Sequence, residues 1–151
     1  MSAPEVDGGL GTDVAAAVNA TRRNNELGKL RASPALNRAA RAHALSMAKL
    51  GYFSHSSADG SSPTRRITDY YRVSGASSWA VGEVMVWAAG SLSARRALEI
   101  WMASSPHRRE ILSARYRELG VGAVRTANAP GVYGGRSVTI VVVDFGRRSR
   151  R

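Results

Sequence analysis

The sequence predicts an α+β domain in which helices cover both faces of a short antiparallel sheet of about three strands, an α-β-α sandwich. Three observations favour this class. Segments with apolar residues at helical spacing follow capping residues in the first half of the chain. A near-continuous Val/Ile run over residues 137–145 is typical of a strand that is covered on both faces. The 151 residues, 44% of them hydrophobic, suffice for one domain with a real core.

The first helix is expected to begin near Thr12, whose hydroxyl can cap it, and to run to about Leu27 before Gly28 stops it. Residues 1–11 precede this start and contain Gly and acidic residues, so they are expected to form a flexible tail. The folded domain is therefore predicted to span residues 12–146.

The second helix begins with a Ser-Pro pair, in which Ser33 caps the helix and Pro34 takes its first position. Gly51 is a suitable stop. The apolar stripe of this helix includes His43, so we expect His43 to be a buried core residue that lies outside any functional cleft.

The middle of the chain contains a loop, a short helix and a strand. Residues 54–61 form a Ser/Gly/Asp loop that carries His55. Another Ser-Pro pair begins a third helix, over about 63–71. Residues 79–87 are predicted to form a strand, and Gly82 inside it indicates a bulge or a close approach of another group.

Two helices follow this strand. The first is predicted over about 94–103, after Ser93 as its cap. The second is short, with Ser105 as cap and Pro106 at its first position, which places His107 second. The positive end of the helix dipole disfavours an imidazolium there, so His107 is expected to be neutral.

The last part of the sheet is expected from two strands, over residues 119–125 and 137–145, separated by a Gly-rich turn. Asp144 lies near the end of the second strand and is interpreted as a residue that caps a turn. Residues 147–151 are expected to form a basic, solvated tail.

The chain is strongly basic, with a formal net charge of +11 at pH 7 and arginine in great excess over lysine. Its Arg-Arg doublets are spread along the whole chain, at 22–23, 65–66, 95–96, 108–109, 147–148 and 150–151. No basic stripe with interleaved aromatic residues forms, which disfavours a nucleic-acid partner. A cationic surface still attracts anionic polymers or an anionic cell envelope.

The composition excludes several classes. Because the chain has no cysteine, disulfide frameworks, cysteine-ligated zinc and thiol catalysis are ruled out. No apolar run is long enough for a transmembrane helix. Residues 1–7 do not form a secretory signal, and one expectation is that a leader or anchor has been removed.

The candidate functional residues are His55, Glu83 and His107. Two imidazoles and one carboxylate are a suitable donor set for an open zinc site with water as the fourth ligand. The same three side chains could instead form a hydrogen-bonded cluster, and their spacing in the sequence leaves both readings open.

Nucleophilic catalysis is poorly supported. Ser54, Ser104 and Ser105 flank the two histidines, but serines at such positions are expected for capping reasons. No Gly-x-Ser-x-Gly elbow is present. The three tryptophans are expected in the core or in the walls of a cleft.

Several short blocks follow one another between about residues 12 and 146. They are Val18-Asn-Ala-Thr-Arg-Arg23, Leu36-Asn-Arg-Ala-Ala40, His43-Ala-Leu-Ser-Met-Ala48, Tyr52-Phe-Ser-His55, Val81-Gly-Glu83, the stretch from Trp101 to Leu112, Glu118-Leu-Gly-Val-Gly-Ala123 and Val143-Asp-Phe-Gly146. Their order resembles the CAP superfamily (cysteine-rich secretory proteins, antigen 5 and pathogenesis-related 1 proteins). It is most similar to the cysteine-free bacterial branch of SCP-like extracellular proteins.

The resemblance implies a central cleft with two histidines and two glutamates, which in some members binds a divalent metal. His55 and His107 match the two histidines, and Glu83 matches the glutamate after glycine. Ser104 stands where many members have the second glutamate, and Val84 stands where an asparagine is common. A metal site would therefore rest on three ligands and carry less negative charge.

By this resemblance, the chain is expected to be a secreted-type binding domain of the extracellular space or cell envelope, and a monomer. Its cleft, with His55, Glu83, His107 and Ser104, would hold a small, lipid-like or extended ligand without catalysis. One alternative is a metal-assisted hydrolase with zinc or another divalent metal on the two histidines and Glu83. A second alternative is a binder of anionic polymers.

Overall fold

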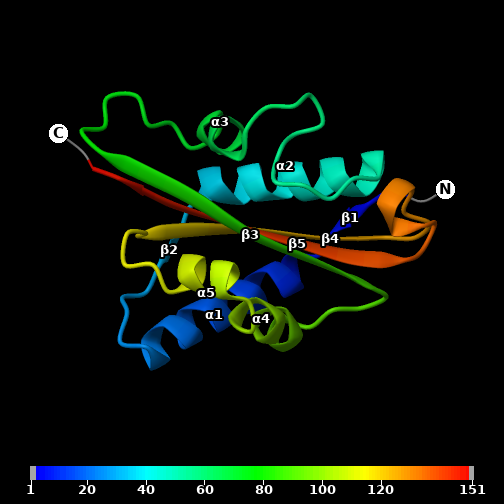
Figure 1. The fold of residues 1–151 in the computed structure, drawn as a ribbon, viewed down its shortest axis with the longest axis horizontal. Coiled ribbons are helices and arrows are strands. Elements are labelled where there is room, and N and C mark those ends of the chain that lie inside the picture. Colours follow the sequence, from blue (N-terminus) through cyan, green and yellow to red (C-terminus); the bar gives the residue numbers. More distant parts are fainter. Residues whose placement is uncertain (1–2, 150–151) are drawn as a thin grey trace.

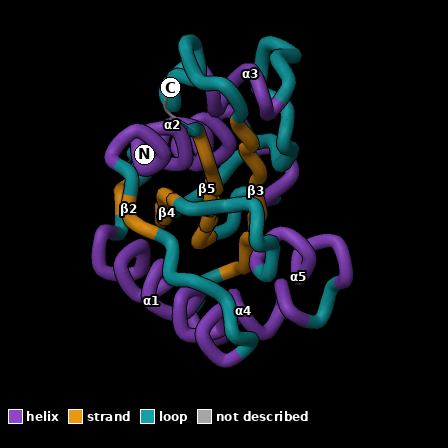
Figure 2. The backbone as a smooth tube through the Cα atoms, turned by 90° about the vertical axis from the view of Figure 1, so that its left-hand side faces the viewer, coloured by secondary structure: helices purple, strands orange, loops and turns teal. Residues whose placement is uncertain are grey.

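Helices lie on both sides of a central sheet in the computed structural model, which describes residues 3–149 (Figure 1). One layer contains α2 and α3, and the other contains α1, α4 and α5, as Figure 2 also shows. The elements in chain order are β1 (Glu5–Val6), α1 (Gly8–Asn24), β2 (Arg31–Ala32), α2 (Pro34–Leu50), α3 (Pro63–Thr68), β3 (Trp79–Ala89), α4 (Ala94–Met102), α5 (Ser105–Ile111), β4 (Glu118–Thr126), the 3-10 turn η1 (Gly131–Tyr133) and β5 (Val138–Arg148). The predicted α+β sandwich is confirmed.

The sheet has the strand order β1-β4-β5-β3, and β2 pairs in parallel with β4. The three long strands are antiparallel, as predicted, and the two-residue strands β1 and β2 are additional. The pairing of β3 with β5 places Glu83 opposite Asp144. Strand β3 is the last in this order and forms one edge of the sheet.

The Val/Ile run forms β5, the central strand, and its first nine residues are buried. Alternate side chains point to opposite faces, so β5 supplies both halves of the core. Val141 and Val143 belong to the apolar cluster under α1 and α4. Ile140 and Val142 belong to the cluster under α2. This double burial is what an uninterrupted apolar strand predicts.

Helix α2 lies very close to β4 because two glycines of the strand face the helix backbone. A Cβ atom at Gly120 would clash with the backbone between Leu36 and Asn37, and one at Gly122 would clash with the backbone of Ala40. Asn37 also accepts a hydrogen bond from the N–H of Val121 at 2.9 Å. The glycines thus fix the distance between the helix and the sheet.

Substituting Gly120 with alanine is expected to destabilise the protein by about 1–3 kcal/mol or more, because overpacking here moves backbone and not a flexible side chain. Gly28→Ala is the matched control, since nothing lies within 4 Å of the added methyl group. Urea unfolding measures both variants. Equal stability of Gly120→Ala and Gly28→Ala would show that α2 can move away from β4 with no loss in the free energy of unfolding.

The expected start of the first helix at Thr12 is wrong. Asp7 caps α1 by accepting from the N–H of Leu10 at 3.0 Å, and the Thr12 hydroxyl donates to the Gly8 carbonyl. Residues 5–11, expected to be part of a tail, form β1 and the first turn of α1. The pairing of β1 with β4 explains the difference, because it holds Asp7 at the start of the helix.

The expected bounds of the other elements are close to those observed. Ser33 caps α2 by accepting from Leu36, and Gly51 ends it with φ at 79°. The expected third helix is shorter and ends at Thr68. Strand β5 extends to Arg148, so the first two residues of the expected basic tail belong to the sheet, whereas residues 150–151 lie outside the described part. Within residues 3–149, no helix is long and apolar enough to cross a membrane.

Candidate functional site

A cleft of about 390 Å³ lies at the edge strand β3, between α3 and α5. His55, Glu83 and His107 all line it, together with Thr64 of α3 and Glu110 of α5. The structure therefore brings the three candidate residues together although 52 positions separate the two histidines. A cavity of about 450 Å³ near Gly90 and Thr126 includes none of them.

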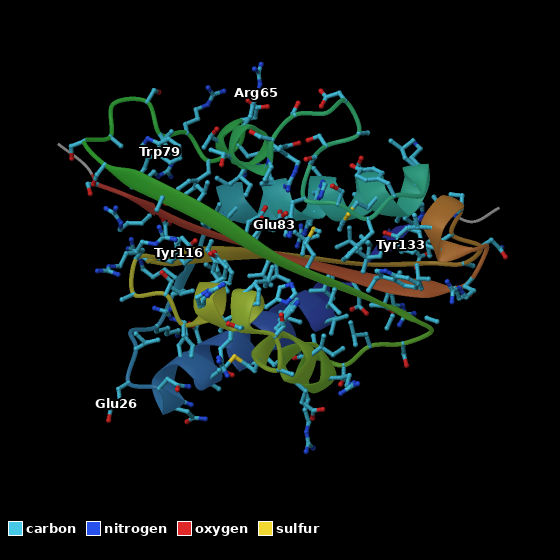
Figure 3. The ribbon with its side chains drawn as sticks, viewed as in Figure 1. Glu26, Arg65, Trp79, Glu83, Tyr116 and Tyr133 are labelled. Carbon is cyan, nitrogen blue, oxygen red and sulfur yellow. The ribbon has the colours of Figure 1, made fainter. Side chains whose placement is uncertain are left out.

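Glu83, which lies on β3 (Figure 3), is the centre of a buried network beside the cleft. Its side chain is 3% exposed. His55 Nδ1 lies 2.8 Å from one carboxylate oxygen, and Arg66 Nη2 lies 2.8 Å from each of the two oxygens. Arg66 Nη2 also donates to the carbonyl of His55 at 2.9 Å. The acid is thus held by a guanidinium and an imidazole at once.

Sequence reasoning missed Arg66. The sequence presents Arg65-Arg66 only as one of several arginine doublets spread along the chain, and Arg65 is exposed and points away from the sheet (Figure 3). Arg66 is 8% exposed and turns inward beside Ile67, which is buried. The only signal available was the position of Arg66 next to the apolar side of a short helix.

Asp144 forms the second acidic group of this network, and the expectation that it caps a turn is wrong. It is fully buried within β5, opposite Glu83. Burial, followed by the charge of Glu83, raises the pKa of Asp144 well above its usual range. Among the described residues, no donor lies within hydrogen-bonding distance of its carboxyl, and Arg66 Nη1 is 3.9 Å away. The raised pKa keeps a proton on Asp144, and a hydrogen bond with Glu83 contributes to this shift.

Glu83 shows the opposite shift. Burial alone would raise its pKa, but hydrogen bonds from Asp144 and His55 and the charge of Arg66 outweigh burial and lower the pKa of Glu83. One negative charge is thus shared by two carboxyl groups and is balanced by one guanidinium. Glu83 and Arg66 thus form a fixed ion pair beside the cleft.

Replacing Asp144 with asparagine is expected to make the protein more resistant to high pH. An acid with a raised folded-state pKa stabilises the fold fully below its unfolded pKa, and this contribution is lost as pH rises through the folded pKa. The asparagine amide keeps a donor for Glu83 and cannot ionise. The stability gain of Asp144→Asn over the wild type should therefore grow with pH.

Urea unfolding between about pH 5 and pH 9 measures this gain, in the range where a raised carboxyl pKa affects stability. Asp13→Asn, at an exposed position on α1, is the control and should show no such growth. A gain for Asp144→Asn that stays constant over this range would mean that Asp144 is already ionised at the lower pH.

His107 lies in the first turn of α5, on the wall opposite α3. The expected cap is wrong by one residue, because Ser104, not Ser105, precedes the helix, and its hydroxyl makes no capping hydrogen bond. Burial, followed by the charge of His55, lowers the pKa of His107, so the expected neutral imidazole agrees with the site. Ser104 itself is not among the residues that line the cleft.

His43 is buried, as expected, with 1% exposure. Its Nε2 lies 2.7 Å from the carbonyl of Ser54, the residue before His55. Burial, followed by the charge of Arg66, lowers the pKa of His43. His43 therefore does not line the cleft, but it holds the backbone that positions His55.

Gly82 makes room for the wall formed by α5. A side chain at this position would collide with the hydroxyl of Tyr116 and the carboxylate of Glu110. Tyr116 donates to Glu110 at 2.5 Å. Glu110 was not singled out from the sequence, and it brings a second carboxylate to the cleft that is already engaged by a tyrosine.

The donor set does not fit a divalent metal held by His55, Glu83 and His107. Both oxygens of Glu83 accept from Arg66, and a cation there would meet the guanidinium charge. Within residues 3–149, no group of three His, Asp or Glu side chains is placed to hold a metal ion. His55 and Glu83 are joined by a hydrogen bond, whereas within residues 3–149 His107 Nδ1 is buried without a partner.

Comparison with known proteins agrees with this fold. The profile of the cysteine-rich secretory protein family (CAP) matches residues 15–145. Among curated proteins, no relative matches. The fold is similar to an SCP-domain extracellular protein from Bacillus anthracis (TM-score 0.70, 23% identity, 96% of this chain and 41% of that chain) and to an outer surface protein from Borrelia burgdorferi (0.68, 18%, 90% and 90%).

A third similar structure is a cysteine-rich secretory protein from Staphylococcus aureus, with a TM-score of 0.63 and 15% identity over 92% of this chain and 38% of that chain. The chain thus spans about two fifths of the Bacillus and Staphylococcus proteins and most of the Borrelia protein. At these identities the likeness concerns the fold alone.

Proposed function

Because the chain belongs to the cysteine-rich secretory protein (CAP) family, we propose that it is a binding domain whose ligand site is the cleft between α3 and α5, with no reaction performed there. Its volume of about 390 Å³ lies within the range of roughly 300–1,000 Å³ that ligand pockets have. The ligand is expected to be small or extended, and polar or amphipathic.

The observation that carries this proposal is the pairing of Glu83 with Arg66. A general base works best when its pKa is near the operating pH. Burial opposes ionisation of Glu83, but the partners of this acid lower its pKa, and both of its oxygens are occupied. Glu83 therefore serves better as an anchor for His55 than as a base or a metal ligand.

The groups left for a ligand are polar. The side chain of His55 is 49% exposed, and only its Nδ1 is used by Glu83. His107, Thr64 and Arg109 add an imidazole, a hydroxyl and a guanidinium to the cleft walls. These groups favour a ligand with several hydrogen-bonding atoms over one that is purely apolar.

We also propose that the protein acts outside the cytoplasm, in the extracellular space or the cell envelope, and as a monomer. Three proteins of similar fold are an extracellular, an outer surface and a secretory protein, which supports this location. The net charge of +11 would hold such a protein near an anionic envelope through long-range attraction.

NMR spectra of the His55 and His107 imidazoles test the binding role directly. We would add dodecanoate, heparin and a blocked peptide separately, and we expect at least one to shift both imidazole signals. His107→Ala should weaken that binding, and Arg23→Ala, at an exposed position on α1, should not. If none of the three probes shifts either signal, the cleft is not a binding site of this kind.

The titration with heparin also distinguishes binding in the cleft from general attraction to polyanions. Affinity that falls steeply with salt, with no imidazole shift, would indicate the anionic-polymer alternative. Within residues 3–149, no observation favours a metal-assisted hydrolase.

Zinc is expected to bind no tighter to the wild type than to His107→Ala, because Arg66 occupies the carboxylate that a metal would need. Isothermal titration measures both proteins at neutral pH, where competition from protons is small. Tight binding that disappears in both His55→Ala and His107→Ala would contradict this and restore the metal site.

A further inference from the structure

We propose that the ligand is an extended peptide segment that adds as a strand to the open edge of β3, between α3 and α5. This inference rests on the binding role proposed above and names its ligand class. Strand addition uses the unpaired backbone groups of a sheet edge for affinity. The structure offers such an edge inside the cleft.

The hydrogen-bond pattern identifies the open backbone groups. In an antiparallel pair, successive residues point their N–H and C=O groups alternately toward the partner strand and away from it. Just beyond the two ends of β3, Ser149 N–H donates to Ser78 at 2.9 Å, and Gly90 N–H donates to Ser137 at 2.8 Å. The backbone N–H and C=O groups of even-numbered β3 residues therefore point toward β5. Those of odd-numbered residues point away from it, toward the open edge.

Trp101 confirms this alternation and limits the open edge. Its indole Nε1–H donates to the carbonyl of Met85, an odd-numbered residue, at 2.9 Å. The edge beyond Met85 is thus covered by α4. Toward the start of β3 the outward residues are Trp79, Val81 and Glu83, and among the described residues β3 pairs with β5 alone.

The two outward residues Val81 and Glu83 are also the ones that line the cleft. Their side chains lie on the α3 side, where Glu83 bonds to Arg66 and Val81 packs near Ile67. On the α5 side, the Tyr116 hydroxyl and the Glu110 carboxylate fill the place that a side chain at Gly82 would take, and they form the second wall. A peptide strand could therefore approach the backbone of β3 between two walls.

The walls argue for a peptide and against a second copy of the chain. Helices α3 and α5 flank the edge of β3 in both views (Figures 1 and 2). Pairing of two β3 strands would bring α3 and α5 of one copy alongside those of the other, and this crowding disfavours a second copy. A single extended chain without layers of its own avoids this collision.

Charge favours an acidic peptide. The charge of Glu83 is balanced by Arg66, and the exposed Arg109 lines the cleft. Glu110 accepts from Tyr116 but keeps its negative charge, so the attraction for an acidic chain comes from the basic surface as a whole. The net charge of +11 raises the local concentration of negatively charged chains.

The test uses acetylated and amidated heptapeptides in which valine alternates with glutamate, serine or lysine. Fluorescence anisotropy measures their affinities, and we expect the glutamate peptide to bind most tightly. Val81→Ala removes part of a side chain that lines the cleft but keeps the outward N–H, so it is the reference variant. Val81→Pro also removes the N–H, so it should bind about fivefold or more weakly than Val81→Ala. Melting temperatures show whether both variants are folded.

Hydrogen exchange of the wild type gives a second readout that needs no variant. The glutamate peptide at saturation should slow exchange of the Val81 and Glu83 amides about tenfold, and leave Gly82, which already bonds to β5, unchanged. Slowed exchange together with weaker binding by Val81→Pro supports strand addition.

Other outcomes overturn the inference. A peptide that shifts the His55 and His107 signals without protecting these amides would overturn strand addition. The proposed binding role would still hold. Binding of dodecanoate or heparin but of no peptide would have the same two consequences. Protection that appears without peptide and rises with protein concentration would identify a second copy as the occupant. Failure of every probe would overturn both proposals.

Discussion

Replacing Arg66 with alanine is expected to destabilise the protein by about 3–5 kcal/mol, because it leaves a buried carboxylate without its counter-charge. The Glu83 side chain is 3% exposed and Arg66 bonds to both of its oxygens. The same change removes the bond from Arg66 to the His55 carbonyl, so ligand binding should also be lost. Urea unfolding and the imidazole spectra measure the two effects.

Arg65→Ala is the matched control, since Arg65 neighbours Arg66 on α3 but is exposed. It should change stability by less than about 0.5 kcal/mol. A double replacement of Arg66 and Glu83 by methionine should recover most of the lost stability, because no buried charge then lacks a partner. A loss of under about 1 kcal/mol in Arg66→Ala would mean that the pair is in contact with water.

Trp101→Ala is expected to cost about 3–5 kcal/mol, the usual range for removing a large buried aromatic side chain. Trp101 is fully buried between α4 and the sheet, and its indole donates to the Met85 carbonyl at 2.9 Å. The variant leaves both a cavity and an acceptor without its donor. Thermal or urea unfolding measures the loss.

Phenylalanine separates these two contributions. Trp101→Phe fills most of the space but loses the donor, so it should cost about 1–3 kcal/mol. Trp79→Phe is the control, because Trp79 is 42% exposed and should tolerate the change. Equal effects of the two substitutions would show that the bond to Met85 contributes nothing measurable.

Local signals predicted most of the fold. The Ser33-Pro34 start and the Gly51 stop of α2 depend on capping chemistry within a few residues, so a single sequence contains them. The apolar run of β5 likewise predicts a strand that is buried on both faces. The start of α1 was missed because pairing of β1 with β4, far along the chain, places Asp7 at the helix end.

The site was predicted only in part, for a similar reason. His55, Glu83 and His107 were identified by motif resemblance, and the structure places them in one cleft. The partners that set their chemistry, Arg66 and Asp144, reach Glu83 from α3 and from β5. Such contacts between distant segments leave no local pattern, so an arginine doublet and a late aspartate looked like surface residues.

The central claim is that Glu83 is a fixed anion paired with Arg66 and not a free base or metal ligand. Carbon-13 NMR of the Glu83 and Asp144 carboxyl groups across a pH titration tests it most directly. We expect Glu83 to stay ionised well below its ordinary pKa of about 4.3 and Asp144 to remain protonated well above about 3.9. A Glu83 that titrates near its ordinary pKa, with Asp144 ionised alongside, would contradict the account.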